Sequence, residues 1–187
     1  GNIGSSTSLD LNTLNIGSNT DATNYSKTTI NGNVFADSTV LNNNGTTNSS
    51  ELILASGKNI TSTITTADNG KGILTLFGGT QTVTGQVGTG GVGGLSLAEV
   101  NAGANGATST FTNDVFATNL DVEGTGTVNL GGDFTGTALR YNDNGIVNLA
   151  DGKNINSSIT SDAPNQGTLN LVGTSTVTGQ VEMQQII

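Results

Sequence analysis

One stretch of this sequence occurs twice, and that repeat constrains the fold more than any other feature. Gly57-Lys58-Asn59-Ile60 opens the first copy, and Gly152-Lys153-Asn154-Ile155 opens the second. Val83-Thr84-Gly85-Gln86-Val87 closes the first copy, and Val177-Thr178-Gly179-Gln180-Val181 closes the second. The offset is 95 residues and falls to 94 after one single-residue deletion. A repeat of this length with so few gaps indicates a fold built by repetition.

The likeness begins upstream of these anchors, so the internal repeats cover about residues 30–87 and 111–181. Val34-Phe35-Ala36 corresponds to Val115-Phe116-Ala117. The second copy then holds 14 extra residues, about where Val128 to Ala138 lie, and we interpret them as an inserted partial coil. Between the copies, Gly88 to Gly106 is the segment richest in glycine, and we expect a loop or a weak coil there.

Apolar and polar residues alternate along the chain, which is typical of strands with one buried face. The simplest strands have two apolar residues two positions apart, at Leu9/Leu11, Leu52/Leu54, Leu74/Leu76, Leu95/Leu97, Val128/Leu130, Val147/Leu149 and Leu169/Leu171. Helical spacing is not sustained anywhere.

A second strand type places a small residue midway between two apolar ones. Its members are Ile30-x-Gly32-x-Val34, Ile60-x-Ser62-x-Ile64, Val83-x-Gly85-x-Val87, Phe134-x-Gly136-x-Ala138, Ile155-x-Ser157-x-Ile159 and Val177-x-Gly179-x-Val181. Alternation would place all three residues on one face. We expect the small residue to face a narrow, closed interior, where side chains from opposite walls compete for volume.

Short strands that recur about every 20 residues indicate a coil that winds back over itself. Turn sequences rich in Asn, Gly and Asp separate them: Asn42-Asn43-Asn44-Gly45, Ala67-Asp68-Asn69-Gly70, Gly88-Thr89-Gly90-Gly91 and Tyr141-Asn142-Asp143-Asn144-Gly145. Each coil would pair in parallel with the coils above and below it. The sequence therefore predicts an all-β solenoid of about nine coils, with residues 1–187 as one segment of a longer domain.

The composition argues against several classes of protein. The net charge is −9, and the five cations form no cluster, so no basic face is available for nucleic acid or for an anionic membrane. Disorder is disfavoured because Val, Ile and Thr are plentiful and regularly spaced. The chain has no Cys and no His, which removes disulfides, thiolate metal sites and the commonest general base. No run approaches the ~18 apolar residues of a membrane span, and no signal peptide opens the chain.

Several motifs resemble the rickettsial surface antigens of the outer-membrane protein A and B type, which are autotransporters. They are the segments 74–87, 115–120, 127–133 and 147–152, and the likeness covers about Ile30 to Val181. The resemblance implies a right-handed parallel β-helix in a passenger domain, exported to the bacterial outer membrane by a C-terminal β-barrel that this chain lacks. It also implies a virulence-associated adhesin or antigen that binds a host cell-surface protein and assists adhesion or entry.

The residue pattern predicts no enzyme, no catalytic or metal site and no cofactor. Asp121 and Glu123 share a strand face, and two close carboxylates could hydrolyse a glycoside. Charges usually lie on the exposed side of an amphipathic strand, so we interpret both as solvated acids. Asn142-Asp143-Asn144-Gly145 and Asp68-Asn69-Gly70 are rich in oxygen ligands, yet they lack the spacing of an EF-hand and are expected to be turns. Gly131-Gly132-Asp133 does not recur as a tandem nonapeptide and is also expected to be a turn.

Two further patterns can be interpreted either as ordinary surface residues or as binding sites. Thr-x-Thr pairs could bind ice if they formed one flat array, and they occur at Thr61/Thr63, Thr82/Thr84, Thr110/Thr112, Thr125/Thr127 and Thr176/Thr178. Since threonine suits the outer face of any strand, we expect scatter instead. Lys58 and Lys153 occupy equivalent repeat positions and are expected to be solvated turn residues rather than a recurrent binding site.

The sequence alone leaves three function classes open. By resemblance, a surface-displayed adhesin leads, a structural surface-layer coat without a specific receptor is the alternative, and a polysaccharide-active enzyme on a β-helix scaffold comes last. The binding face stays unknown. A solenoid whose terminal strands have unpaired backbone edges is also expected to associate end to end, unless the first residues or Glu182 to Ile187 form a cap.

Overall fold

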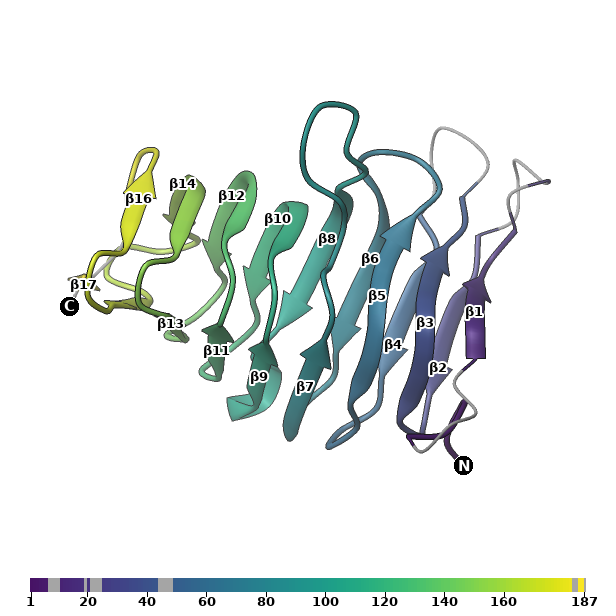
Figure 1. The fold of residues 1–187 in the computed structure, drawn as a ribbon. Coiled ribbons are helices and arrows are strands. Elements are labelled where there is room, and N and C mark those ends of the chain that lie inside the picture. Colours follow the sequence, from purple (N-terminus) through teal and green to yellow (C-terminus); the bar gives the residue numbers. More distant parts are fainter. Residues whose placement is uncertain (7–10, 19, 21–24, 44–48, 183–184, 187) are drawn as a thin grey trace.

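A computed structural model describes residues 1–6, 11–18, 20, 25–43, 49–182 and 185–186. Over these residues the chain winds as a parallel β-solenoid of about 7 turns. In Figure 1 the nearer strands rise and the farther strands descend while the chain advances from right to left, so the winding is right-handed. This is the hand that parallel crossover connections favour. The predicted β-helix is thus confirmed, and the described helical structure is one 3-10 turn, Ala104–Gly106.

Odd-numbered and even-numbered strands follow one another around the coil, and each set pairs in parallel along the axis. The first sheet holds β1 (Leu11–Ile16), β3 (Val34–Leu41), β5 (Ile60–Thr66), β7 (Thr80–Thr84), β9 (Thr108–Phe111), β11 (Thr127–Leu130), β13 (Ile146–Leu149), β15 (Thr168–Leu171) and β17 (Gln185–Ile186). The second holds β2 (Lys27–Ile30), β4 (Glu51–Leu54), β6 (Lys71–Leu76), β8 (Leu97–Ala102), β10 (Val115–Val122), β12 (Phe134–Tyr141), β14 (Asn154–Ser161) and β16 (Thr176–Thr178).

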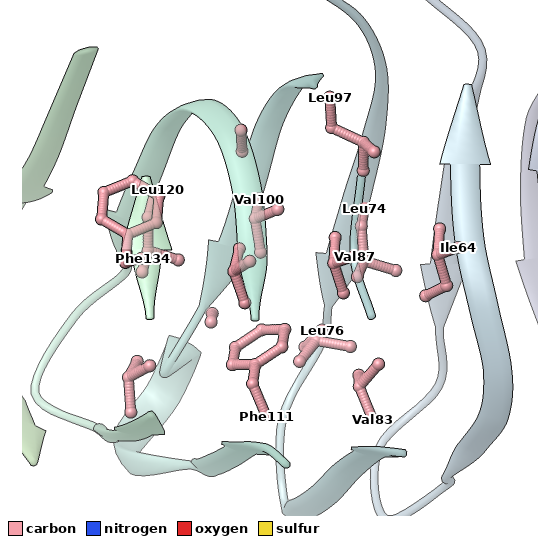
Figure 2. Close-up of a cluster of buried hydrophobic side chains, with 14 of the residues drawn as sticks. Ile64, Leu74, Leu76, Val83, Val87, Leu97, Val100, Phe111, Leu120 and Phe134 are labelled. Atoms are coloured by element: carbon pink, nitrogen blue, oxygen red, sulfur yellow. The ribbon is translucent and has the colours of Figure 1, made fainter. Parts of the chain in front are cut away.

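Three columns of stacked inward side chains, one for each face of the coil, run along the axis within the core. Column 1 is Val34, Ile60, Val83, Phe111, Leu130, Leu149 and Leu171. Column 2 is Ile64, Val87, Val115, Phe134, Ile155 and Val177. Column 3 is Leu52, Leu74, Val100, Leu120, Leu139, Ile159 and Val181. Figure 2 shows side chains of all three columns meeting in the interior. The outer surfaces over columns 1, 2 and 3 are called face 1, face 2 and face 3 below.

The two sequence repeats do not occupy the same faces. Ile60 lies in column 1, whereas its counterpart Ile155 lies in column 2. Leu74 lies in column 3, whereas its counterpart Leu169 lies beside Leu171 on face 1. The second copy therefore lies four complete turns further along the axis and is rotated onto the next face of the coil. The same sequence unit thus forms different faces of the solenoid in the two copies.

The structure has fewer coils than the predicted nine because the coils are longer than expected. They range from 19 residues, between Phe111 and Leu130, to 28 residues, between Val83 and Phe111. The longest coil contains the loop at 88–96, which rises above the strands just before β8 (Figure 1). Surface loops can lengthen a coil without altering its buried columns, so dividing the chain length by a coil of about 20 residues overestimates the number of turns.

Two local expectations between the repeats need correction. The 14 extra residues of the second copy produce a whole coil rather than a partial one, since Val115 stacks under Phe134 and Phe134 under Ile155. In the first copy, Val34 stacks directly under Ile60. The segment Gly88 to Gly106 begins as the expected loop, but it also contains β8, which pairs fully with β6 and β10.

Other expectations fall partly outside the described residues. Leu9, Asn44 and Gly45 lie there, while Leu95 is described and precedes β8 instead of belonging to a strand. The expected cap at Glu182 to Ile187 is described only in part, where Gln185–Ile186 pair with β15. End-to-end association stays a prediction.

The small central residues of the second strand type mark corners, where the chain passes from one face to the next. Ser62 and Ser157 point inward, as predicted, and are 4% and 5% exposed. Gly85 is half-buried and Gly179 is exposed, so the expectation that these glycines face the interior is wrong. Their backbone φ values of +131° and +140° lie in a region that suits glycine, and this explains their presence.

Asparagine and aspartate side chains tie successive coils together at two corners, a feature that the sequence analysis missed. Each side-chain oxygen accepts the backbone amide of the matching residue one coil later. One chain of such bonds links Asn2, Asn33, Asn59 and Thr82 at 2.8–3.0 Å, and a second links Asp114, Asp133 and Asn154 at 2.8–2.9 Å. The sequence carries part of the signal, because an Asn or Asp directly precedes the first apolar residue in three of the second-type strands, at Ile60, Phe134 and Ile155. Corner amides that have no ladder partner are satisfied in this way.

Tyr141 is the largest fully buried side chain, and its hydroxyl donates to the carbonyl of Thr168 at 3.0 Å. Burial raises the pKa of Tyr141. Because the folded protein favours the neutral phenol, this contribution to stability is complete below the ordinary tyrosine pKa of about 10. Above that pH the unfolded chain releases a proton that the folded chain keeps, and the contribution is lost at up to about 1.4 kcal/mol per pH unit.

Urea unfolding at pH 8 to 11 is therefore expected to show a steeper alkaline loss for the native sequence than for Tyr141→Phe. The substitution should cost about 1 kcal/mol at pH 8, where only the hydroxyl hydrogen bond is lost. Tyr25→Phe is the matched control, because Tyr25 is 57% exposed. Parallel alkaline slopes for the native protein and Tyr141→Phe would contradict the argument.

Candidate binding surface

The acidic pair singled out in the sequence is held in place by the next coil. Asp121 is only 3% exposed, and Arg140 donates from Nε and Nη2 to its two carboxylate oxygens at 2.6 and 2.5 Å. Glu123 accepts a hydrogen bond from Asn142 at 2.8 Å. The interpretation of both as solvated acids is wrong for Asp121, because Arg140 lies over it. Donation of these hydrogen bonds to the Asp121 carboxylate in turn raises the pKa of Arg140.

In the oxygen-rich turns, side-chain oxygens accept hydrogen bonds from backbone amides. Asp143 accepts the amide of Asn144 at 2.7 Å, and Asn69 accepts the amide of Ser96 at 2.9 Å. Asp133 belongs to the corner chain of hydrogen bonds. These bonds fit the turn interpretation. Among the described residues, no three or more His, Cys, Asp or Glu side chains gather in a group that could hold a metal ion.

The Thr-x-Thr pairs do not form one array. Thr82 stacks on Thr110, but Thr127 aligns with Thr108 instead. Thr176 and Thr178 lie on face 2, where they pair with Asn154 and Asn156. By the criterion of a single flat array, the ice-binding interpretation fails.

Lys58 and Lys153 occupy matching turns, as expected from the repeat. The amide of Lys58 donates to Ala55, and that of Lys153 donates to Ala150, both at 3.2 Å. Both side chains are half-buried. Because the copies are rotated by one face, the two lysines lie at different corners and do not form a repeated site on one side of the solenoid.

Face 1 carries a ladder of side-chain amides. Asn148 donates to Asn129 at 2.8 Å, Asn170 donates to Asn148 at 2.7 Å, and Asn129 donates to Thr110 at 3.2 Å. These side chains lie between the inward apolar residues of β9, β11, β13 and β15. A ladder of this kind uses most of its hydrogen-bonding capacity internally, so it stiffens the face and leaves few groups for a ligand.

Face 3 differs because an apolar hollow opens on it. A cavity of about 310 Å³ is lined by Thr29, Asn31, Ile53, Ala55 and Phe77. These residues come from the three successive coils that contain β2, β4 and β6. Phe77 is 59% exposed in a chain with only 4% aromatic residues. Sequence reasoning missed this site, although the aromatic residue directly after Leu76 was a signal.

A second hollow, of about 340 Å³, lies near the C-terminal end. It is lined by Ser161, Asp162, Ala163, Pro164, Asn165 and Glu182. Asp162 and Glu182 are exposed, and the Ser161 hydroxyl is bonded to the carbonyl of Ala163 at 2.9 Å. Two exposed acids on a turn do not make a ligand site, so the hollow on face 3 is the better candidate.

Comparison with known proteins adds no relative: no family model, no curated protein and no solved structure matches the chain. In the described part of the chain, no helix has the length and apolar character needed to cross a membrane.

Proposed function

We propose that this solenoid is a surface-displayed segment of an autotransporter passenger domain, on the outer membrane of a bacterium, which acts as an adhesin or invasion-associated antigen. In this role it is exported through a C-terminal translocator and binds a protein on the host cell surface. It has no catalytic part. The family resemblance supplies the role, and the β-solenoid is the observation that supports it most directly.

The architecture fits a rigid stalk that presents its outer faces. Column 1 runs without interruption from Val34 to Leu171, columns 2 and 3 run beside it, and all three need little apolar sequence. The outer faces are polar and tied from coil to coil, as in the amide ladder of face 1. A stiff, polar rod keeps its shape outside the cell and holds a binding surface at a distance from the membrane.

Binding of the purified chain to cultured host cells tests the proposal. A fluorescent label on the chain should show saturable binding that excess unlabelled protein displaces, and protease treatment of the cells should abolish it. A heat-unfolded sample is the control. Assembly into ordered sheets by electron microscopy, without cell binding, would favour the structural coat instead. Turnover of an acidic polysaccharide would favour an enzyme.

A further inference from the structure

We propose that the hollow on face 3 is a binding site for an uncharged glycan, with Phe77 as the surface on which a sugar ring stacks. The site would be a property of the folded chain itself. It does not depend on the proposed surface display, because binding can be measured with purified protein and free oligosaccharides.

The hollow is formed by stacked coils rather than by a loop. Asn31, Ala55 and Phe77 follow one another along one outer column, since Ala55 N donates to Ile30 and Phe77 N donates to Leu54. Thr29 and Ile53 pair in the adjacent outer column. Ala55 is the small member between a long amide and an aromatic ring, so the surface is recessed there. The walls are held by backbone ladders, and the site is therefore largely preformed.

The lining chemistry selects an uncharged, amphipathic ligand. Ile53, Ala55 and Phe77 supply the apolar floor, while Thr29 and Asn31 add a hydroxyl and an amide at the rim. The face of an aromatic ring is negative, so it attracts the weakly positive C–H groups of a sugar ring. A few polar groups then orient the sugar hydroxyls. Its volume of about 310 Å³ lies at the lower end for small-molecule sites.

Charge argues against an acidic glycan. The five lining residues carry no charge, and the chain as a whole has a net charge of −9. Lys27, two residues before Thr29 on β2, forms an ion pair with Glu51 at 2.8 Å. A sulfated or sialylated sugar would meet no charged lining residue here, and the overall field would repel it.

The second sequence repeat supplies an internal contrast. Asn148 stands where the first copy has Ile53, and Val172 stands where it has Phe77. Asn148 is part of the amide ladder, and Val172 is 53% exposed. The aromatic ring and its aliphatic neighbour are thus the features that distinguish the first copy from the second. Architecture alone does not require them, because the second copy folds without them.

Titration with chitotriose and maltotriose, followed by NMR chemical shifts, tests the site. At least one of these neutral sugars should bind in the millimolar range and shift the resonances of Thr29, Ile53 and Phe77. Phe77→Val, which copies the second repeat, should weaken binding about tenfold or more. Phe77→Tyr should retain it. Val172→Phe is the matched control and should leave the affinity unchanged.

Folding does not confound these variants, because the side chain of Phe77 is mostly exposed and the thermal midpoint should hardly change. Three results would overturn the proposal: neither neutral sugar binds, Phe77→Val binds as well as the native protein, or sialyllactose binds more tightly than both neutral sugars. If the purified chain binds a neutral sugar but does not bind host cells, the adhesin role is refuted and the glycan site is not.

Discussion

The Gly85→Ala substitution is expected to lower the free energy of unfolding by about 3 kcal/mol. Gly85 sits at a corner between Val83 of column 1 and Val87 of column 2, with φ at +131°. A Cβ atom there would lie 2.2 Å from the carbonyl oxygen of Ser62 in the coil below. That oxygen belongs to the backbone of a paired strand and cannot move aside cheaply. A single methyl group therefore adds a collision to an unfavourable φ.

Gly57→Ala separates these two causes. Gly57 has a positive φ of +70°, but a Cβ atom there meets nothing within 4 Å. This variant should lose only about 1 kcal/mol, since alanine tolerates the left-handed region at modest cost. Urea unfolding of both variants, followed by circular dichroism, gives the comparison. Equal losses would mean that the close approach to Ser62 contributes nothing, and no loss at Gly85 would refute the corner geometry.

The solenoid itself could be predicted because its core obeys a local rule. Ile60, Ser62 and Ile64 alternate with threonines, and all three are buried as the alternation requires. The faces could not be predicted in the same way. Ile60 and Ile64 belong to different columns, since β3 and β5 shift register at Phe35 and Ser38 and the strand bends there. A bulge of this kind depends on the neighbouring coil and leaves no clear mark in one strand.

The number of coils and the candidate site depend on contacts that sequence spacing does not reveal. In β8, Leu97, Val100 and Ala102 are buried, but their spacing breaks the alternation and hides the strand. Thr29 pairs with Ile53, a contact between coils that can be identified only once the length of the intervening coil is known. The corner hydrogen bonds were different, because the Asn or Asp before Ile60, Phe134 and Ile155 could have been noticed. The candidate site is harder still to predict from the sequence, since the hollow on face 3 arises where the two repeats differ.

The ion pair between Arg140 and Asp121 is expected to be the most costly polar contact to break. Asp121 is buried, and Arg140 is the cation that donates to both of its oxygens, with Glu99 at 3.8 Å from the same guanidinium. Arg140→Met removes the cation and leaves a carboxylate beneath an apolar side chain. Because an uncompensated buried charge is strongly unfavourable, the free energy of unfolding at pH 7 should fall by about 3 kcal/mol.

Asp121→Asn combined with Arg140→Met should recover at least half of that loss, because the double variant buries no charge. Lys27→Met is the matched control: it breaks the pair with Glu51, where the lysine side chain is 64% exposed, and should cost less than about 1 kcal/mol. Urea unfolding of the three variants at pH 7 measures these differences. If the double variant is as unstable as Arg140→Met alone, then the arginine stabilises β10 and β12 through packing of its aliphatic stem, and the charge of Asp121 is not the cause.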